Sequence, residues 1–413
     1  MVQGYCHEKF AIVREIFEKN INTGFERGAA VAIELEGEKV VDLWGGIDND
    51  EKQTSWQKDT IVNVFSTTKG IAAICLLQLV EEEKIKLGDP VSKYWPEFAQ
   101  NGKENIPIIY LLNHQSGLCG ITKPLPENAF ENWDLIVNSL AEQKPQWKPG
   151  TLHGYHALTF GHLIGEILRR VTGETLGQYF SRKIAKPLGL EFYIGLPDEK
   201  FDNVTDIQPI IFSKFIKMMI PLIQAVPKSL LSQDLAFAKD FKNPQTISGS
   251  AFSNPDFEFE IPFRPNSKQW RKAEIPAANG HSDARSISKL YGILANGGSR
   301  DGIHVLDKKT IEQARQTSSE GKDLVLGNLN TRFGHGFMLG SKHISMGPNR
   351  DAFGHGGAGG SLGFADPDHH ISFGFVMNQM HPGVSAWETA IELVTKVYEI
   401  KKYNIHPHFN PPH

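Results

Sequence analysis

One segment of ten residues sets the strongest limit on how this chain can fold. The run Ile71–Val80, IAAICLLQLV, is long enough for a helix and is apolar on every side. A helix without a polar face must be surrounded by other parts of the protein. A charged run, EEEKIKLGDP, begins at Glu81 and closes it. The sequence therefore predicts a helix buried in the middle of the fold, with the rest of the chain packed around it.

Periodic segments near both ends predict the elements that surround this helix. A helical pattern starts at Phe10, and two strands follow at Ala30–Glu36 and Lys39–Trp44. The last hundred residues contain short strand-like runs divided by Gly, Asp-Pro and Asp-His-His, before a final helix near Ala386–Glu399. Two more helices are predicted in between: one from Leu158 to a C-cap at Gly173, and one capped by Ser282 that ends at Gly297.

This arrangement favours an α+β fold in a single domain, residues 1–413, with two lobes. Both ends of the chain, about 1–85 and 280–400, would form an α/β lobe with an antiparallel sheet flanked by the terminal helices. Residues of about 86–279 would form an inserted, mostly helical lobe, and 401–413 a loose tail. A cleft between two lobes is the default place for an active site.

Composition excludes several classes of protein. A formal net charge of −4 and a pI of about 6.5 provide no basic surface for nucleic acid. No uninterrupted apolar run is long enough for a transmembrane segment, and the N-terminus lacks the apolar core of a secretory signal. Three cysteines without metal-ligand spacing suit a reducing compartment, so we predict a cytoplasmic protein.

The pattern Ser-x-x-Lys occurs four times, so context must separate a nucleophile from chance. Serine and lysine three residues apart can touch if a helix holds them. Ser66 and Lys69 meet this condition, because they follow a strand-like TIVNVF and open the buried helix. A helix start also offers an oxyanion unpaired N–H groups and the positive end of the dipole. The other pairs fall before a strand, inside an amphipathic surface helix and in a polar loop: Ser55/Lys58, Ser286/Lys289 and Ser319/Lys322.

The lysine of this pair has a second unusual property. On a helix that is otherwise apolar, the ammonium of Lys69 is drawn out of bulk water, and desolvation lowers its pKa so that it can accept a proton. The simpler interpretation is a serine N-cap followed by a lysine whose ammonium reaches back to solvent. The stretch VFSTTKG alone leaves both interpretations open.

Other residues compete for a chemical role. Ser361 lies in GGSLG, which fits Gly-x-Ser-x-Gly, but a nucleophile elbow needs a helix after the serine, and here a strand-like run follows. The glycines are better explained by a sheet edge that comes close to a substrate. Neither histidine-rich segment, HGYHALTFGH or DPDHH, has a recognised zinc spacing, so we predict no metal site.

A poorly regular region contains the apolar run Ile210–Leu231, which lysines and prolines interrupt. We interpret it as a cleft wall or lid, with contact to a lipid surface as the alternative. As a lid it would offer an apolar acyl pocket, in which Phe215 and Met219 are candidate lining residues.

Six segments occur in an order that is more specific than any one of them: FSTTKG, LLNHQSGL, WKPGTLHGYHALTFGHLIGEILRRVTG, PLGL, AANGHSDARSISKLYGILANGG and FGHGGAGGSLGFADP. From about Gly28 to Gly374, the chain resembles the serine β-lactamase-related family: class C β-lactamases, DD-peptidases and above all the family VIII carboxylesterases. The resemblance implies a β-lactamase/transpeptidase-like fold and a serine hydrolase that works through an acyl-enzyme, with no cofactor.

The resemblance also implies a role for each matching residue. Ser66 would be acylated, Lys69 would hold or take its proton, and Tyr155 of GYHA stands where the family has the tyrosine of Tyr-x-Asn. The nearby lysine would lower the pKa of this phenol, so that the pair shares one proton. His355-Gly356-Gly357 falls at the Lys-Thr-Gly strand motif, and the N–H groups of Ser66 and, on that strand, Ala358 would form the oxyanion hole. The alternatives are a core tyrosine and a purely structural histidine.

Two departures from the family pattern concern the substrate. The third position of Tyr-x-Asn is Ala157, so an amide that grips lactam or peptide substrates is missing. His355 replaces a lysine, and histidine is charged only part of the time near neutral pH. We therefore predict an esterase for a small neutral ester. The alternatives are a β-lactamase or DD-peptidase that hydrolyses amides, and a catalytically weak scaffold that assembles as a homo-oligomer.

Overall fold

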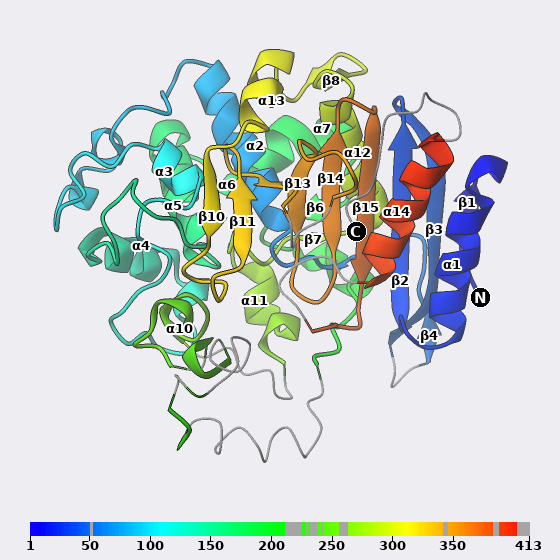
Figure 1. Cartoon of the computed structure of the whole chain (residues 1–413), viewed down its shortest axis with the longest axis horizontal. Helices are drawn as coiled ribbons and strands as arrows, with labels where there is room; N and C mark the ends of the chain where they lie inside the picture. Colours follow the sequence, from blue (N-terminus) through cyan, green and yellow to red (C-terminus); the bar gives the residue numbers. More distant parts are fainter. Residues whose placement is uncertain are drawn as a thin grey trace.

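A computed structural model describes residues 1–49, 53–210, 225–227, 230, 238–241, 243–255, 263–341, 346–382 and 388–402. Within them, both ends of the chain build a ten-stranded antiparallel sheet in the order β1-β3-β2-β15-β14-β13-β12-β11-β10, with β4 paired to β3 (Figure 1). The strands are β1 (Gln3–Cys6), β2 (Gly28–Leu35), β3 (Glu38–Asn49), β4 (Thr54–Ser55), β10 (Ser319–Lys322), β11 (Asn330–Phe333), β12 (Met338–Leu339), β13 (Phe353–Gly356), β14 (Leu362–Asp366) and β15 (Ile371–Met377).

Helices cover both faces of this sheet. In Figure 1, α1 (Ala11–Asn22) and α14 (Glu388–Lys402) lie in front of it, and α12 (Ala284–Ala295) lies behind it. Glycine on β15 allows α12 to approach closely, because a Cβ at Gly374 would lie 2.2 Å from the Ala284 carbonyl oxygen. The predicted α+β fold is confirmed.

The middle of the chain supplies mostly short helices. They are α2 (Thr68–Glu81), α3 (Ile109–Leu112), α4 (Trp133–Glu142), α5 (Thr159–Thr172), α6 (Leu176–Phe180), α7 (Lys186–Leu188), α10 (Ile247–Phe252), α11 (Lys268–Lys272) and α13 (Lys308–Ala314). Two small sheets accompany them: β5 (Val62–Asn63) with β7 (His281–Ser282) and β6 (Phe192–Tyr193), and the hairpin of β8 (Ser299–Arg300) and β9 (Ile303–His304).

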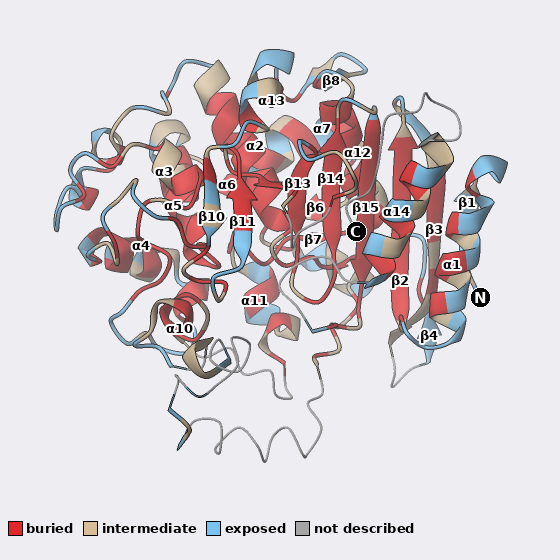
Figure 2. Ribbon diagram, viewed as in Figure 1, coloured by how far each residue is buried: buried red, intermediate tan, exposed pale blue. Residues whose placement is uncertain are grey.

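The helix α2 is the buried central helix that the sequence predicts. Every residue from Thr68 to Leu79 is buried, and α2 contacts α5, α6 and β13 (Figure 2). The predicted first helix, the two predicted strands β2 and β3, and α5 are confirmed as well. Gly173 is the C-cap of α5, with a φ of 78° in the left-handed region that glycine tolerates best.

Three predictions on the local structure are wrong. The N-cap of α12 is Asp283, whose side chain accepts a hydrogen bond from Ser286 N at 2.7 Å. Ser282 lies on β7 instead, and its hydroxyl donates to Glu191 O at 2.9 Å. The predicted end of α12 is confirmed, because Gly297, with a φ of 95°, directly follows the C-cap Asn296. The other two corrections concern burial and a loop: α12 packs beneath the sheet rather than on the surface, and Ser319–Lys322 is the strand β10.

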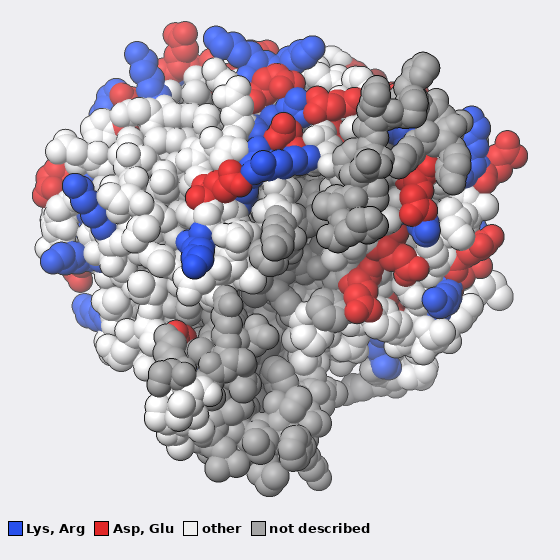
Figure 3. Space-filling model, in the orientation of Figure 1, with Lys and Arg blue, Asp and Glu red and all other residues white. Residues whose placement is uncertain are grey.

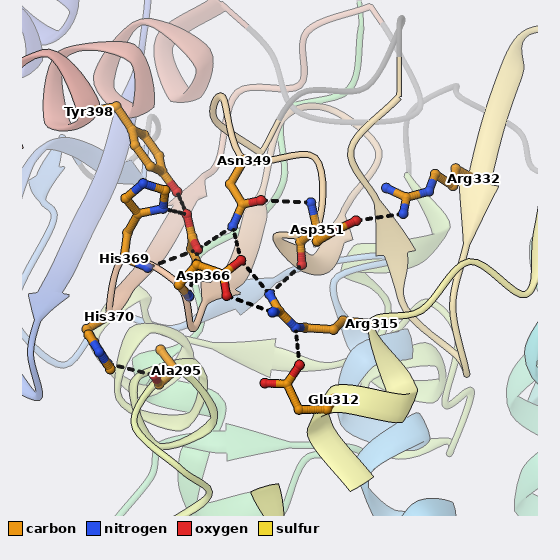
Figure 4. Close-up of polar contacts among 11 residues, drawn as sticks. Ala295, Glu312, Arg315, Arg332, Asn349, Asp351, Asp366, His369, His370 and Tyr398 are labelled. Carbon is orange, nitrogen blue, oxygen red and sulfur yellow. Dashed lines mark hydrogen bonds and ion pairs between the residues drawn. The ribbon is translucent and has the colours of Figure 1, made fainter. Parts of the chain in front are cut away.

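A polar network fixes the C-terminal helix to the sheet (Figure 4). Asp366, which ends β14 and is fully buried, accepts hydrogen bonds from His369 Nδ1 at 2.8 Å, from Asn349 Nδ2 at 2.6 Å and from the hydroxyl of Tyr398 on α14. Burial raises the pKa of Asp366, but these hydrogen bonds outweigh it and hold the pKa below its usual range. Asn349 also reaches Asp368, which pairs with Arg315.

The surface shows no continuous area of one charge on the face drawn in Figure 3, where basic and acidic side chains are interspersed. Within the described part of the chain, none of the helices combines the length and the hydropathy that a membrane crossing requires.

The close contact between α2 and α12 gives a testable prediction. A Cβ at Gly70 would lie 2.1 Å from the Tyr291 hydroxyl oxygen, which has no hydrogen-bond partner among the described residues. Gly70→Ala should therefore lower the free energy of unfolding by roughly 1–2 kcal/mol, because overpacking outweighs the better helix propensity of alanine. In a Tyr291→Phe background the nearest atom is Cζ of the ring at 3.3 Å, so most of the clash is removed and the same change should cost clearly less. Urea denaturation of the four proteins measures this, and an equal loss in both backgrounds would contradict it.

Candidate active site

Ser66 lies at the sharp turn between β5 and α2. The residue before it, Phe65, has a φ of 44°, an uncommon conformation for an aromatic residue. Between Thr60 and Leu79, Ser66 is the one residue that is not buried. The fold therefore presents a single serine to solvent from an otherwise buried segment.

Lys69 lies beneath this serine and is fully buried. Its Nζ is 3.1 Å from Ser66 Oγ, and it donates hydrogen bonds to Ala157 O at 2.7 Å and Ala277 O at 2.9 Å. Burial lowers the pKa of the Lys69 ammonium well below its ordinary value. The simpler interpretation, in which the ammonium reaches solvent, is wrong for this lysine. The helix N-cap is Thr67, which forms no side-chain cap.

As an ammonium, Lys69 donates to Ser66 Oγ as well as to the two carbonyl oxygens; when the amine is neutral, the two carbonyls fix the direction of its lone pair. A neutral amine has two N–H groups and one lone pair in tetrahedral arrangement. Carbonyl oxygens can only accept, so Ala157 O and Ala277 O take the two N–H groups. The remaining direction, toward Ser66 Oγ, then holds the lone pair, which can accept the serine proton.

Tyr155 packs against the same lysine, with its ring centroid 4.6 Å from Lys69 Nζ. Burial raises the pKa of the Tyr155 phenol, while its proximity to Ser66 opposes the rise. The expectation that the lysine lowers this pKa is therefore wrong: Nζ lies over the ring face, and burial dominates. At neutral pH Tyr155 carries its proton.

Asp323 holds Tyr155 in place and was not found from the sequence. Its Oδ1 accepts hydrogen bonds from the backbone N–H groups of Tyr155 at 3.0 Å, Val325 at 2.9 Å and Leu326 at 3.0 Å. Its Oδ2 accepts from Thr331 Oγ1 at 3.1 Å. Burial raises the pKa of Asp323, against the effect of these donors. Asp323 lies in the loop after β10. The sequence there shows only an acidic residue next to two apolar ones, and this pattern predicts no role in the site.

A histidine of the LLNHQSGL segment also supports this tyrosine. His114 Nδ1 accepts from His156 N at 3.1 Å, and its ring lies 5.2 Å from that of Tyr155. The histidines of HGYHALTFGH contact protein groups too: His153 Nε2 lies 2.8 Å from Thr331 Oγ1, and His156 Nδ1 donates to Gly154 O at 2.7 Å.

The segment from His355 to Ala358 passes beside Ser66. His355 and Gly356 end β13, while Gly357 and Ala358 lie in the turn after it, so Ala358 is not on the strand as expected. A Cβ at Gly357 would lie 2.3 Å from Val64 O, which explains the glycine. From Ala352 to Gly360, Ala358 alone is half-exposed. In the described part of the chain, the backbone N–H groups of Ser66 and Ala358 donate no hydrogen bond.

The imidazole of His355 is buried within the same site. Its Nδ1 donates to Gly356 O at 2.6 Å, and its ring lies 5.8 Å from that of Tyr155. Burial, with a contribution from Lys69, lowers the pKa of His355 to about 3. His355 is therefore neutral near pH 7, not partly charged as expected from an ordinary histidine.

Ser361 is buried and has a structural role instead of a catalytic one. It is 1% exposed, and its hydroxyl donates to Val64 O at 2.8 Å and lies 3.1 Å from Thr67 Oγ1. The strand β14 follows it, as predicted. This serine joins the β13–β14 turn to the backbone beside Ser66. Phe215 and Met219, the candidate pocket residues, lie outside the described residues.

Comparisons with known proteins agree with this geometry. The Beta-lactamase family model matches residues 13–396, so the chain belongs to the beta-lactamase family. The chain is a serine hydrolase of that family.

Individual relatives are similar over nearly their whole length. The Esterase/beta-lactamase LipL of Mycobacterium tuberculosis is 30% identical over 383 residues, which cover 92% of this chain and 83% of the relative. The crystal structure of a family VIII carboxylesterase has a TM-score of 0.84 and 37% identity, over 97% of this chain and 100% of that chain. A penicillin-binding protein homolog from Caulobacter crescentus has a TM-score of 0.83 and 35% identity over the same shares.

The hydrogen bonds of Asp323 give a second prediction. Asp323→Ala would leave three buried N–H groups without an acceptor, at about 1–3 kcal/mol each, so the free energy of unfolding should fall by at least about 3 kcal/mol. Asp323→Asn keeps an acceptor oxygen for them and should lose clearly less. Urea denaturation compares the two variants, and equal losses would show that these three hydrogen bonds do not carry the effect.

Proposed function

We propose that this protein is a carboxylesterase that hydrolyses small neutral esters through an acyl-enzyme on Ser66. One observation carries the proposal: the single half-exposed residue of a buried segment is a serine, and it contacts a lysine whose two other partners are carbonyl oxygens. This arrangement supports a nucleophile with its base already in place.

The residues divide the reaction as follows. Lys69 takes the proton of Ser66 Oγ as the oxygen attacks the ester carbonyl, and the backbone N–H groups of Ser66 and Ala358 stabilise the oxyanion. The carbon–oxygen bond of the ester then breaks, and the alkoxide leaves as an alcohol with the proton from Lys69. In this proposal Tyr155, whose protonated hydroxyl has no hydrogen-bond partner among the described residues, relays that proton. Water, activated by the same amine, releases the acid and restores Ser66.

The charge of the site supports a neutral substrate. His355 is uncharged near neutral pH, and Ala157 supplies a backbone carbonyl to Lys69 but no side-chain amide to a substrate. Neither residue offers the cation or amide that would hold the carboxylate or amide of a β-lactam or peptide. The names of the relatives above, an esterase/beta-lactamase and a family VIII carboxylesterase, support an ester as the substrate. A homo-oligomer and a cytoplasmic location stay predictions.

The first test uses two serines of the same site. Wild type, Ser66→Ala and Ser361→Ala are incubated with a fluorophosphonate probe, p-nitrophenyl butyrate and a chromogenic cephalosporin. We expect the adduct on Ser66, and a loss of ester turnover of at least about 1000-fold in Ser66→Ala but not in Ser361→Ala. Cephalosporin turnover equal to ester turnover would favour the amide-hydrolase alternative. An unlabelled, inactive wild type would favour a scaffold.

The pH dependence tests the neutral lysine. Because burial lowers the pKa of Lys69, its base form is present well below the pH at which ordinary lysine loses its proton. kcat/KM for a neutral ester should therefore rise with pH and reach its plateau well below pH 10.5. His355→Asn should not alter the shape of this profile between about pH 5 and 8, because His355 stays neutral there. A histidine-like inflection that this variant removes would contradict the assignment.

A further inference from the structure

Three potential metal ligands meet on the surface at the far end of α2 from Ser66. Glu81 ends α2, His304 lies on β9, and Asp307 precedes α13, at the upper edge of the view in Figure 1. One ligand atom of each lies within 4.8 Å of the other two. His304 Nε2 is 3.0 Å from Glu81 Oε2 and 4.0 Å from Asp307 Oδ1. All three line a cavity of about 440 Å³.

Hydrogen bonds already orient two of these side chains. Glu81 Oε1 accepts from the backbone N–H of Asp307 at 2.6 Å, which leaves Oε2 directed to His304. On the other side of the imidazole, His304 Nδ1 lies 3.2 Å from Ser299 Oγ on the neighbouring strand. Metal-binding histidines are held in this way, through the ring nitrogen that does not face the ion.

The carboxylate of Asp307 does not cap the helix α13 that follows it. Aspartate at an N-cap usually accepts a hydrogen bond from the first turn, but Asp307 forms no such bond with α13. Its side chain is 71% exposed, so it can move the short distance that coordination requires.

Gln78 also lines the cavity and has a buried amide oxygen without a partner in the described part of the chain. Gln78, one turn before Glu81, is 6% exposed, and its Nε2 donates to Val305 O at 2.9 Å. Its Oε1 is buried and has no hydrogen-bond partner among the described residues. A buried oxygen of this kind is costly unless a ligand or a water binds it.

The charge of the cavity favours a cation. Its lining contains three carboxylates, from Glu81, Glu82 and Asp307, and one ammonium, from Lys183. Lys183 Nζ pairs with Glu82 at 2.7 Å, which leaves the other two carboxylates beside His304. The negative end of the α2 dipole also lies here.

We propose that Glu81, His304 and Asp307 bind a divalent transition-metal ion of the Zn²⁺ class, with water in the remaining coordination positions. Imidazole with carboxylates suits Zn²⁺, whereas Mg²⁺ and Ca²⁺ prefer oxygen ligands alone. Zn–ligand bonds of about 2.0–2.2 Å place tetrahedral ligand atoms about 3.3–3.6 Å apart. The distance from His304 Nε2 to Glu81 Oε2, 3.0 Å, is slightly shorter than this range, and the distance from His304 Nε2 to Asp307 Oδ1, 4.0 Å, is slightly longer. The ion would join α2, β9 and α13, about 18 Å along α2 from Lys69.

The test is a titration of the full chain with ZnCl₂, followed by calorimetry. Wild type should bind one ion more tightly than His304→Ala or Asp307→Ala by at least about 100-fold, since outer-shell partners alone are worth about 10- to 100-fold. Zn²⁺ should raise the Tm of wild type and leave that of both variants unchanged.

Glu82→Gln is the matched control, because it removes a carboxylate from the same cavity but no proposed ligand. It should retain binding within about 10-fold of wild type, well above the two ligand variants. Wild type that binds no Zn²⁺ would overturn the proposal. So would equal affinity and stoichiometry in wild type, His304→Ala and Asp307→Ala, which would place binding elsewhere, for example at the C-terminal histidines 406 and 408.

Discussion

The burial of the Lys69 amine is the interaction on which the active site depends. An amine without solvent is stable only if its N–H groups find acceptors and its charge is lost or balanced. Here the acceptors are two backbone carbonyls from distant loops, those of Ala157 and Ala277. The loop that carries Tyr155 and the segment that precedes β7 must both close over α2 before the lysine is satisfied. The same folding step that satisfies the buried lysine therefore also assembles the active site.

The same dependence extends to the other side of Ser66. The β13–β14 turn reaches the nucleophile through Ser361, whose hydroxyl bonds to Val64 O, and through Thr67, whose hydroxyl donates to His355 O at 3.3 Å. Glycine at position 357 lets the two backbones approach to within contact distance. The hydroxyl groups of Ser361 and Thr67 take no part in the reaction, but they fix the position of the backbone N–H groups that face a substrate. An oxyanion hole requires rigid positioning of this kind.

Local patterns in the sequence predict a large part of this structure. The apolar run of α2, the strand before Ser66 and the glycine that ends α5 each depend on neighbours in the chain, and each is found. The structural role of Asp323 could not be predicted in this way, because it depends on three backbone N–H groups that only the folded chain brings to its carboxylate. The pKa of Tyr155 was predicted with the wrong sign for the same reason: it depends on burial, and burial is a property of the assembled protein.

The pairing of β2 with β15 has a consequence for how the protein is made. Gly28–Leu35 and Ile371–Met377 lie at opposite ends of the chain, yet they are neighbours in the centre of the sheet, from Leu35 opposite Ile371 to Ala29 opposite Met377. A ribosome releases the first strand long before it has synthesised the second. During that interval the hairpin of β2 and β3 has an open edge, and the apolar α2 has no sheet to cover it. The nascent chain therefore carries aggregation-prone surface through most of its synthesis, and this is the kind of surface that molecular chaperones cover.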